Sequence, residues 1–354
     1  MRRNLLVYVA AILVTALLLL GACSGQQGQK PADLQRPAGS QEAAQPAPAK
    51  EMTKLVVAEL RSEFWLPAYL AETLGYYADE GLEVEFVTAK DGPVAFQGMH
   101  AGSSHFTMLS TEPVFRAQAQ GLESIIIMST LTRKPYMFVG SPEITDISQL
   151  KGKTIFAGMP GSAPFSFAIS ILEKAGLTEN DVTWAQMEYG ASLAALEKGH
   201  IDASYIPSTA KKEVAAIGAN ILVDASDPVQ HQELYGTSRY ESTIVTGTKE
   251  FVENNREVVQ KFVNAVVRAM IWVSQNSDEE VAAMAKEMFQ ADSLTADEIS
   301  YLRPSLSEDG FITEEGHEAI VSFCLAAGII DRYIPYDEVY DMSFVKNAWQ
   351  KYKK

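Results

Sequence analysis

Four short stretches of the chain combine hydroxyl, charged and aromatic side chains, and each comes just before a predicted helix. The free backbone N–H groups and partial positive charge of a helix start bind carboxylate, sulfonate or carbonyl oxygens. A guanidinium pairs with an anion, and an aromatic ring in a polar loop stacks on a planar or apolar ligand. The pattern therefore predicts a binding site for a small organic molecule. The candidate ligand contacts are Arg61, Phe64, Trp65, Ser110, Thr111, Glu112, Gly161, Ser162, Tyr205 and Ser208.

Several candidates also have a purely structural explanation. Ser162 and Ser208 occupy positions typical of helix caps, and capping alone would account for them. Arg61 has Glu59 and Glu63 nearby, and these carboxylates could neutralise it in place of an anionic ligand. The sequence leaves both explanations open.

The roles of Glu112 and Tyr205 also have two explanations each. Glu112 could recognise an amine, or it could simply favour the start of its own helix through the helix dipole. Tyr205 ends a predicted strand that faces the expected cleft, but a place in the core of a lobe fits its position equally well.

The sequence contains none of the common catalytic motifs. A Gly-x-Ser-x-Gly elbow, a His-Glu-x-x-His pair, a Gly-x-x-x-x-Gly-Lys-Ser/Thr loop and a dinucleotide glycine fingerprint are all missing. The five histidines are scattered, and no two of them have the spacing of metal ligands. The pattern favours a binding protein over an enzyme, and we expect no cofactor and no metal.

The elements that would hold these stretches alternate between short apolar runs and helical segments. Runs such as Leu55–Leu60, Leu82–Val87 and His105–Leu109 predict strands, and the alternation begins again near Thr154. Strands that alternate with helices indicate a mostly parallel sheet with helices on both faces. We therefore expect two α/β lobes. Ligands of open parallel sheets bind beyond the carboxyl ends of the strands, where the candidate stretches lie.

A long amphipathic helix is predicted at 256–274, where apolar residues recur at spacings of three and four. The chain beyond it lacks the strands for a third sheet, so its helices are expected to pack on the first lobe. This gives a first lobe of 53–140 and 240–354, a second lobe of 141–239, and crossing segments near 136–140 and 240–246 that act as a hinge.

The start of the chain predicts export. Two arginines precede an apolar run from Leu5 to Leu20, which is shorter than the roughly 20 residues that span a bilayer. The motif that ends at Cys23 resembles the bacterial lipobox, although a retained membrane-anchor helix is an alternative. We interpret 1–22 as a lipoprotein signal peptide and Cys23 as a lipidated residue that anchors the protein at the extracytoplasmic face of the cell membrane. Residues 23–52, rich in Gln, Pro, Ala and Gly, are expected to form a flexible tether.

Composition excludes several classes of protein. Hydrophobic residues make up 47% of the 354 residues, which is enough for a sizeable core. The formal net charge of −16 argues against binding to nucleic acid, which needs a basic face. Two cysteines are too few for a disulfide scaffold or a four-cysteine metal site. We expect a monomer.

Five segments, in chain order, resemble the ABC-transporter solute-binding proteins for sulfonates, nitrate, taurine and thiamine-pyrimidine precursors. The resemblance covers most of 54–285, and its order along the chain makes it specific. The segments are 75–84 (GYYADEGLEV), 150–155 (LKGKTI), 158–163 (GMPGSA), 172–178 (LEKAGLT) and 194–203 (AALExGxIDA).

The resemblance implies a two-lobed type II periplasmic-binding-protein fold that closes on its ligand. It also implies ligand contacts from the loop after the first strand, from 110–112, from Gly161 and Ser162, from the loop near Ser208 and from the return strand near Tyr240. The first loop departs from the family pattern because it carries two large aromatic residues and two charges, so a sulfonate or nitrate preference does not transfer. Pyrimidine synthases of the same superfamily have a cysteine cluster that this chain lacks.

We therefore expect a lipid-anchored solute-binding component of an ABC importer. It would capture a small organic ligand, of aromatic, sulfonate or pyrimidine-like character, between its lobes and present it to an ABC permease in the membrane. An enzyme that acts on a pyrimidine-like substrate in the same cleft is one alternative, and turnover would reveal it. A sensory adaptor that reports ligand occupancy to a membrane partner is the other.

Overall fold

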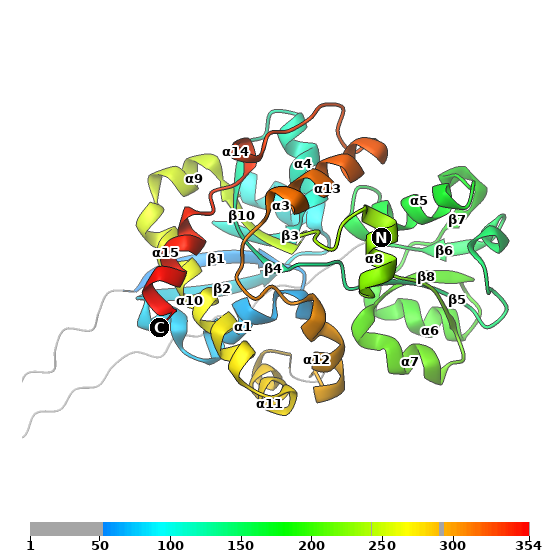
Figure 1. Ribbon diagram of the computed structural model, residues 1–354, viewed down its shortest axis with the longest axis horizontal. Coiled ribbons are helices and arrows are strands. Elements are labelled where there is room, and N and C mark those ends of the chain that lie inside the picture. The colour runs from blue at the N-terminus through cyan, green and yellow to red at the C-terminus, as the bar shows by residue number, and fades with distance from the viewer. Residues whose placement is uncertain (1–51, 242, 290–293, 354) are drawn as a thin grey trace, which may run out of the picture. The chain divides into compact units, whose positions relative to one another are not determined.

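The computed structural model describes residues 52–241, 243–289 and 294–353. The predicted signal peptide, the predicted lipidation at Cys23 and nearly all of the predicted tether lie outside the described residues and stay predictions. Two five-stranded sheets form the centres of two lobes (Figure 1). Among the helices of the described ranges, none is long and apolar enough to cross a membrane.

The first sheet has the strand order β2-β1-β3-β10-β4. β1 pairs in parallel with β2 and β3, whereas β10 runs antiparallel to β3 and β4. Every residue of β4 is buried, as expected for a strand in a sheet that is covered on both faces. The strands are β1 (Thr53–Glu59), β2 (Leu82–Thr88), β3 (Phe106–Ser110), β4 (Ser124–Leu131) and β10 (Thr243–Thr248).

The helices around this sheet come from both ends of the described chain. The predicted helix at 256–274 is confirmed as α10, whose buried face includes Val259, Phe262 and Val266. The C-terminal helix α15 packs on α10 and β4, so the end of the chain returns to the first sheet. These helices are α1 (Leu66–Thr73), α2 (Tyr76–Asp79), α3 (Gly92–His100), α4 (Thr111–Ala119), α9 (Lys249–Asn254), α10 (Arg256–Gln275), α11 (Asp278–Phe289), α12 (Ala296–Leu302), α13 (Glu314–Ala326), α14 (Tyr336–Val339) and α15 (Ser343–Tyr352).

The second sheet has the strand order β7-β6-β8-β5-β9, with β5 antiparallel to β8 and β9. It is built entirely from the middle of the chain. Its strands are β5 (Tyr136–Gly140), β6 (Thr154–Phe156), β7 (Thr183–Trp184), β8 (Ala203–Pro207) and β9 (Asn220–Asp224), and its helices are α5 (Ala163–Lys174), α6 (Ser192–Glu197), α7 (Lys211–Ala216) and α8 (Pro228–Tyr235).

Both sheets are mostly parallel, as predicted, and each contains one antiparallel strand, β10 or β5. These are the first strands that the chain forms after it crosses between the sheets. The sequence analysis assigned 136–140 to the first lobe, but β5 pairs with β8 and β9 and so belongs to the second sheet. The first crossing therefore lies at 132–135. Below, the first and second lobes are the two sheets with the helices named with each.

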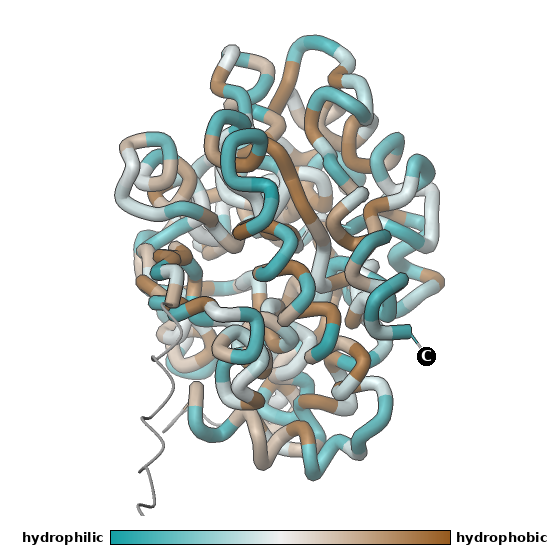
Figure 2. The backbone as a smooth tube through the Cα atoms, turned by 90° about the vertical axis from the view of Figure 1, so that its left-hand side faces the viewer, coloured by the Kyte–Doolittle hydropathy of each residue, from teal (hydrophilic) through white to brown (hydrophobic). Residues whose placement is uncertain are grey.

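The largest cluster of buried apolar side chains draws on both lobes. It includes Phe64 and Trp65 from the first lobe and Tyr136 and Tyr205 from the second. Figure 2 shows the hydropathy of each residue along the backbone, with polar stretches at many of the outer turns. The expected ligand cleft is therefore bordered by the apolar core itself.

Candidate ligand-binding site

A cavity of about 380 Å³ lies where the two lobes meet. In the first lobe its walls are the loops that follow β1, β2 and β3. In the second lobe they are the start of β5, the start of α5, the loop that follows β7 and the end of β8. This is the location that open α/β sheets offer to ligands, since their loops converge at the carboxyl ends of the strands.

The cavity brings together more than half of the predicted contacts, although they are far apart in the sequence. Three come from the first loop, one from the end of β3 and two from the second lobe. The predicted residues that line the cavity are Arg61, Phe64, Trp65, Ser110, Ser162 and Tyr205.

The remaining predicted contacts lie elsewhere. Thr111, Glu112 and Tyr240 are buried and do not line the cavity. Ser208 is also buried, and its backbone N–H donates to the carbonyl oxygen of Pro135 at 2.9 Å. Gly161 lines a second, outer cavity instead.

Glu112 pairs with an amine that the chain itself supplies. Lys134 Nζ donates to Glu112 Oε1, and both side chains are fully buried. The hydroxyl of Tyr240 donates to the same oxygen at 3.2 Å. The amine recognition considered for Glu112 is therefore satisfied internally, beneath the cavity.

Aromatic rings from both lobes form the apolar walls of the cavity. The ring centroids of Phe64 and Tyr136 are 5.9 Å apart, and those of Tyr136 and Tyr205 are 4.9 Å apart at an interplanar angle of 84°. Tyr189 lies edge-on to Tyr205, with 6.0 Å between the centroids. Trp65 is anchored on the first lobe, because its indole N–H donates to the carbonyl oxygen of Ile244 at 3.2 Å. Such walls suit a flat, apolar or aromatic ligand.

The polar part of the cavity is acidic. Asp91 is 2% exposed, and its Oδ1 has no hydrogen bond of good geometry from the described residues, although the backbone N–H groups of Gly92 and Met159 lie close to the carboxyl. The hydroxyl of Tyr189 donates to Asp91 Oδ2 at 3.4 Å. Glu63 accepts a hydrogen bond from the hydroxyl of Thr209 at 2.7 Å. Burial raises the pKa of both Asp91 and Glu63 above the usual carboxyl range.

The two cationic residues of the lining are engaged away from the centre of the cavity. Arg61 donates from its guanidinium to the carbonyl oxygen of Met288 at 3.0 Å. Lys90 Nζ lies 3.9 Å from Glu188 Oε1, and both of these side chains are mostly exposed. Within the described residues, neither cation therefore forms an ion pair with Asp91 or Glu63.

Arg61 also has an unusual backbone. Within the described ranges it is the one non-glycine residue with positive φ, at 46°. Its backbone N–H donates to Glu59 Oε2, so the carboxylate considered as its charge partner instead holds the strained turn. Such strain occurs preferentially at ligand clamps, where surrounding contacts maintain it.

A glycine makes room for Tyr189. Gly158 has φ of 79°, and a Cβ added there would overlap the Tyr189 hydroxyl. This hydroxyl lies 3.5 Å from Ser162 Oγ and thus reaches both Ser162 and Asp91. Gly158 therefore positions Tyr189 across the cavity.

The sequence analysis missed Asp91, Tyr136 and Tyr189 as lining residues. Asp91 had a usable signal, because it follows the second strand and precedes a helix, as the other candidates do. Tyr136 and Tyr189 had no such signal, because Tyr136 begins β5 and Tyr189 begins a short 3-10 helix, η4 (Tyr189–Ala191).

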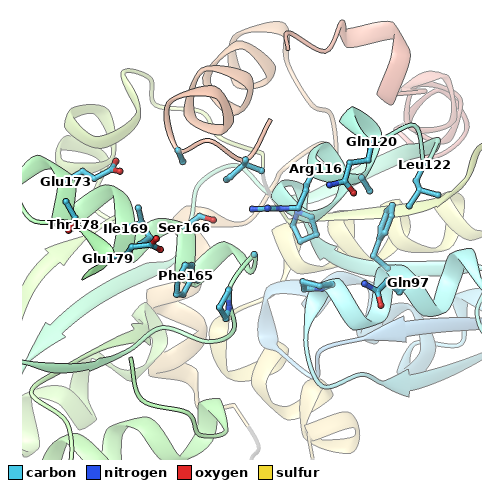
Figure 3. Close-up of a pocket in the computed structure, with 18 of the residues that line it drawn as sticks. Gln97, Arg116, Gln120, Leu122, Phe165, Ser166, Ile169, Glu173, Thr178 and Glu179 are labelled. Atoms are coloured by element: carbon cyan, nitrogen blue, oxygen red, sulfur yellow. The ribbon is translucent and has the colours of Figure 1, made fainter. Parts of the chain in front are cut away.

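The outer cavity is larger, at about 680 Å³, but its polar lining is mostly exposed. Figure 3 shows Arg116, Gln97 and Gln120 on its first-lobe side, opposite Glu173 and Glu179 of the second lobe. It resembles a solvated groove between the lobes. We therefore take the smaller, aromatic cavity as the candidate ligand site.

Comparisons with known proteins identify relatives over most of the described chain. A family model described as NMT1/THI5 like matches residues 64–280. A Bacillus subtilis protein, provisionally named an aliphatic sulfonates-binding protein, is 27% identical over 297 residues, which cover 81% of this chain and 86% of that protein. The riboflavin-binding protein RibY of Chloroflexus aurantiacus is 27% identical over 272 residues, which cover 75% of this chain and 74% of that protein.

Solved structures share the fold. The alkanesulfonate-binding protein SsuA from Xanthomonas axonopodis pv. citri, bound to MOPS, has a TM-score of 0.63 at 17% identity and covers 85% of this chain and 99% of its own. The desulfurization enzyme DszB has a TM-score of 0.57 at 15% identity and covers 84% of this chain and 99% of its own. Both a binding protein and an enzyme therefore use this architecture, and the fold alone does not separate the two functions.

Proposed function

Because the chain belongs to the NMT1/THI5-like family and has the two-lobed fold of periplasmic binding proteins, we propose that it is the solute-binding component of an ABC importer. It is anchored by a lipid on Cys23 at the extracytoplasmic face of the membrane. It captures a small organic ligand between its lobes by hinge closure and presents that ligand to an ABC permease.

The observation that carries this proposal is the shared construction of the cavity. The first lobe contributes Phe64 and Asp91, and the second lobe contributes Tyr136, Tyr189 and Tyr205. A ligand in the cavity touches both lobes at once, so it binds the closed arrangement better than any open one. This difference in affinity is what shifts a two-state protein toward closure.

Direct contacts between the lobes at the cavity edge support closure. The Thr209 hydroxyl of the second lobe donates to Glu63 of the first at 2.7 Å. The hydroxyls of Ser110 and Tyr136 are 3.3 Å apart across the same boundary. Together with the ion pair between Lys212 and Asp297, these contacts would break and re-form as the lobes open and close.

An enzyme in the same cleft is the second candidate, favoured only by the likeness of fold to DszB. The described lining of the cavity contains no cysteine and no histidine. The two functions are separated by whether a bound ligand is retained unchanged or converted.

The test is a thermal-shift and small-angle scattering screen of the purified full-length protein in detergent. The probes are benzamidine, benzamide, cytosine, riboflavin, benzenesulfonate and 1-butanesulfonate. A true ligand at 100 times its Kd stabilises the folded protein by about 2.7 kcal/mol, which raises Tm by several degrees. It also makes the particle more compact and is recovered unchanged.

Two aromatic variants control the screen. Tyr205→Ala removes a wall of the cavity and is expected to abolish the shift in Tm. Tyr333→Ala removes a tyrosine that is 48% exposed and lies outside the cavity, and it should leave the shift intact. If no probe shifts Tm, or if both variants respond alike, the proposed function is contradicted.

A further inference from the structure

We propose that the ligand of this cavity is a flat molecule, either neutral or cationic, that donates a hydrogen bond from an N–H group to Asp91. Because a carboxylate repels anions and only accepts hydrogen bonds, Asp91 disfavours the binding of sulfonates and of other anions that have no donor. This inference rests on the proposed function and names the chemical class of its ligand.

The first support is the unsatisfied oxygen of Asp91. This carboxylate is 2% exposed and lines the cavity; the backbone N–H groups of Gly92 and Met159 approach it, yet its Oδ1 has no hydrogen bond of good geometry from the described residues. A buried carboxylate oxygen without a donor costs free energy, and nearly all such oxygens in folded proteins are paired. A donor on the ligand would provide the missing partner.

The second support is the distribution of charge around Asp91. Its Oδ2 accepts from Tyr189, and its chain neighbour Lys90 points outward to Glu188. Glu63 adds a second carboxyl to the lining, whereas Arg61 donates to Met288. An anionic ligand would meet two acidic groups, neither of which is ion-paired within the described residues, and this is unfavourable in a site of low dielectric. A neutral or cationic donor is favoured there.

The third support is the scarcity of free N–H groups at the helix starts. Helix starts are the usual anion sites in such folds. Here the second residues of α1, α3 and α5 are Pro67, Pro93 and Pro164, respectively, and proline has no backbone N–H. At α5, the hydroxyl of Ser162 accepts from the backbone N–H of Phe165 at 3.4 Å, so another donor is already used. Anion recognition by these helix starts is therefore weakened.

The fourth support concerns the shape of the ligand. Tyr136 and Tyr205 meet edge to face at 84°, and Phe64 closes the wall from the first lobe. Such walls offer ring faces and edges to a planar molecule, and the Asp91 carboxylate lies in the same lining. A planar ring system with an N–H group satisfies both features at once.

The first experiment compares probes on the wild-type full-length protein by isothermal titration calorimetry. Benzamidine and benzamide carry N–H donors, and benzenesulfonate places an acceptor-only anion on the same ring. We expect the donor probes to bind at least about tenfold tighter than benzenesulfonate, as one hydrogen bond to a charged group predicts. Tighter binding of benzenesulfonate would overturn this inference and leave the proposed function standing. If no probe of either class binds, both this inference and the proposed function fail.

The second experiment replaces the carboxylate. Asp91→Asn keeps the shape and the acceptor for Tyr189 but removes the negative charge. It is expected to weaken benzamidine binding by about tenfold to a hundredfold and to strengthen benzenesulfonate binding. Glu83→Gln, a matched change at an exposed carboxylate that does not line the cavity, should leave both affinities unchanged.

A purely structural role for Asp91 predicts a different result. Asp91→Asn would then lower the Tm of the unliganded protein and weaken every probe alike. The inference instead predicts an unchanged or raised Tm without ligand, together with a selective loss of donor probes. If benzamidine still binds to Asp91→Asn but not to Tyr205→Ala, the cavity is the binding site and the role that we propose for Asp91 is wrong.

Discussion

At the scale of single residues, the hydrogen bonds of three polar side chains characterise the candidate site. Asp91 has one carboxylate oxygen without a hydrogen bond in the described structure. Glu63 accepts from Thr209 and Tyr189 donates to Asp91, and both of these hydrogen bonds connect the two lobes. Buried polar groups that lack partners are costly, and they occur where a ligand or a moving element completes them. The Asp91 carboxyl group can therefore accept a further hydrogen bond.

The raised pKa of Asp91 leads to a prediction about pH. Because burial raises this pKa in the folded protein, the unliganded protein should lose stability as pH rises from the ordinary aspartate range through the raised value. Asp91→Asn does not titrate. The Tm of Asp91→Asn minus that of the wild type should therefore grow from about pH 4 to about pH 7.

Thermal melts of both proteins across this range check the prediction. A difference for Asp91→Asn that is largest at pH 4 would contradict the assigned direction.

Gly158 gives a second residue-level prediction. Gly158→Ala would place a Cβ against the Tyr189 hydroxyl and put a side chain at φ of 79°, so we expect Tyr189 to be displaced and the affinity for a bound probe to fall by about tenfold or more. Gly176→Ala has a similar φ of 74° but nothing within 4 Å, so it is the matched control for backbone strain. Equal loss of affinity in both variants would show that strain, not Tyr189, is responsible.

At the scale of elements, the crossing between β4 and β5 is held by a buried charge pair. Lys134 lies in this crossing, and its Nζ is 4.6 Å from the ring centroid of Tyr240 and 5.0 Å from that of Tyr136. Its pairing with Glu112 fixes the crossing to α4 of the first lobe. Because Tyr136 lies two residues after Lys134 and lines the cavity, the pair also fixes one wall of the candidate site.

Removing one partner of this pair leaves an uncompensated buried charge. Lys134→Met should therefore lower the free energy of unfolding by about 3–5 kcal/mol, and the double variant with Glu112→Gln should recover part of the loss. Urea unfolding measures both values. Lys54→Ala, which breaks an exposed pair with Glu83, should cost at most about 1 kcal/mol. A loss for Lys134→Met as small as that of the control would disprove the structural role.

The contact between the 3-10 helices η1 (Glu63–Trp65) and η5 (Ser208–Ala210) gives a prediction about closure. Thr209→Val removes the hydroxyl that donates to Glu63 without changing the shape of the side chain. It should weaken ligand binding by about fivefold to tenfold, since this bond exists only when the lobes meet, and it should barely alter the free energy of unfolding.

Thr246→Val is the matched control. Its hydroxyl donates within the first lobe, to the carbonyl oxygen of Ile125 at 2.9 Å. This variant should lower the free energy of unfolding and leave ligand affinity unchanged. The reverse pattern, with affinity lost in Thr246→Val and kept in Thr209→Val, would argue against a closure contact at η5.

At the scale of the whole molecule, the chain leaves the first sheet once and returns once. This connection by two crossing segments suits the hinge closure that we propose. The alternating strands and helices, the two mostly parallel sheets and the amphipathic helix α10 could all be predicted from the sequence. Local periodicity carries this information, because it sets which face of each element is apolar.

The sequence by itself also predicted where the candidate ligand contacts gather, since helix-start loops of parallel sheets converge at one edge. Only the tertiary structure decided which side chains face the cavity. Arg61 is tied to Met288, Glu112 is paired with Lys134, and Tyr189 meets Asp91, each across a wide separation in the chain. Such partners are chosen by packing between elements and lobes, and the pattern within any one segment does not encode them.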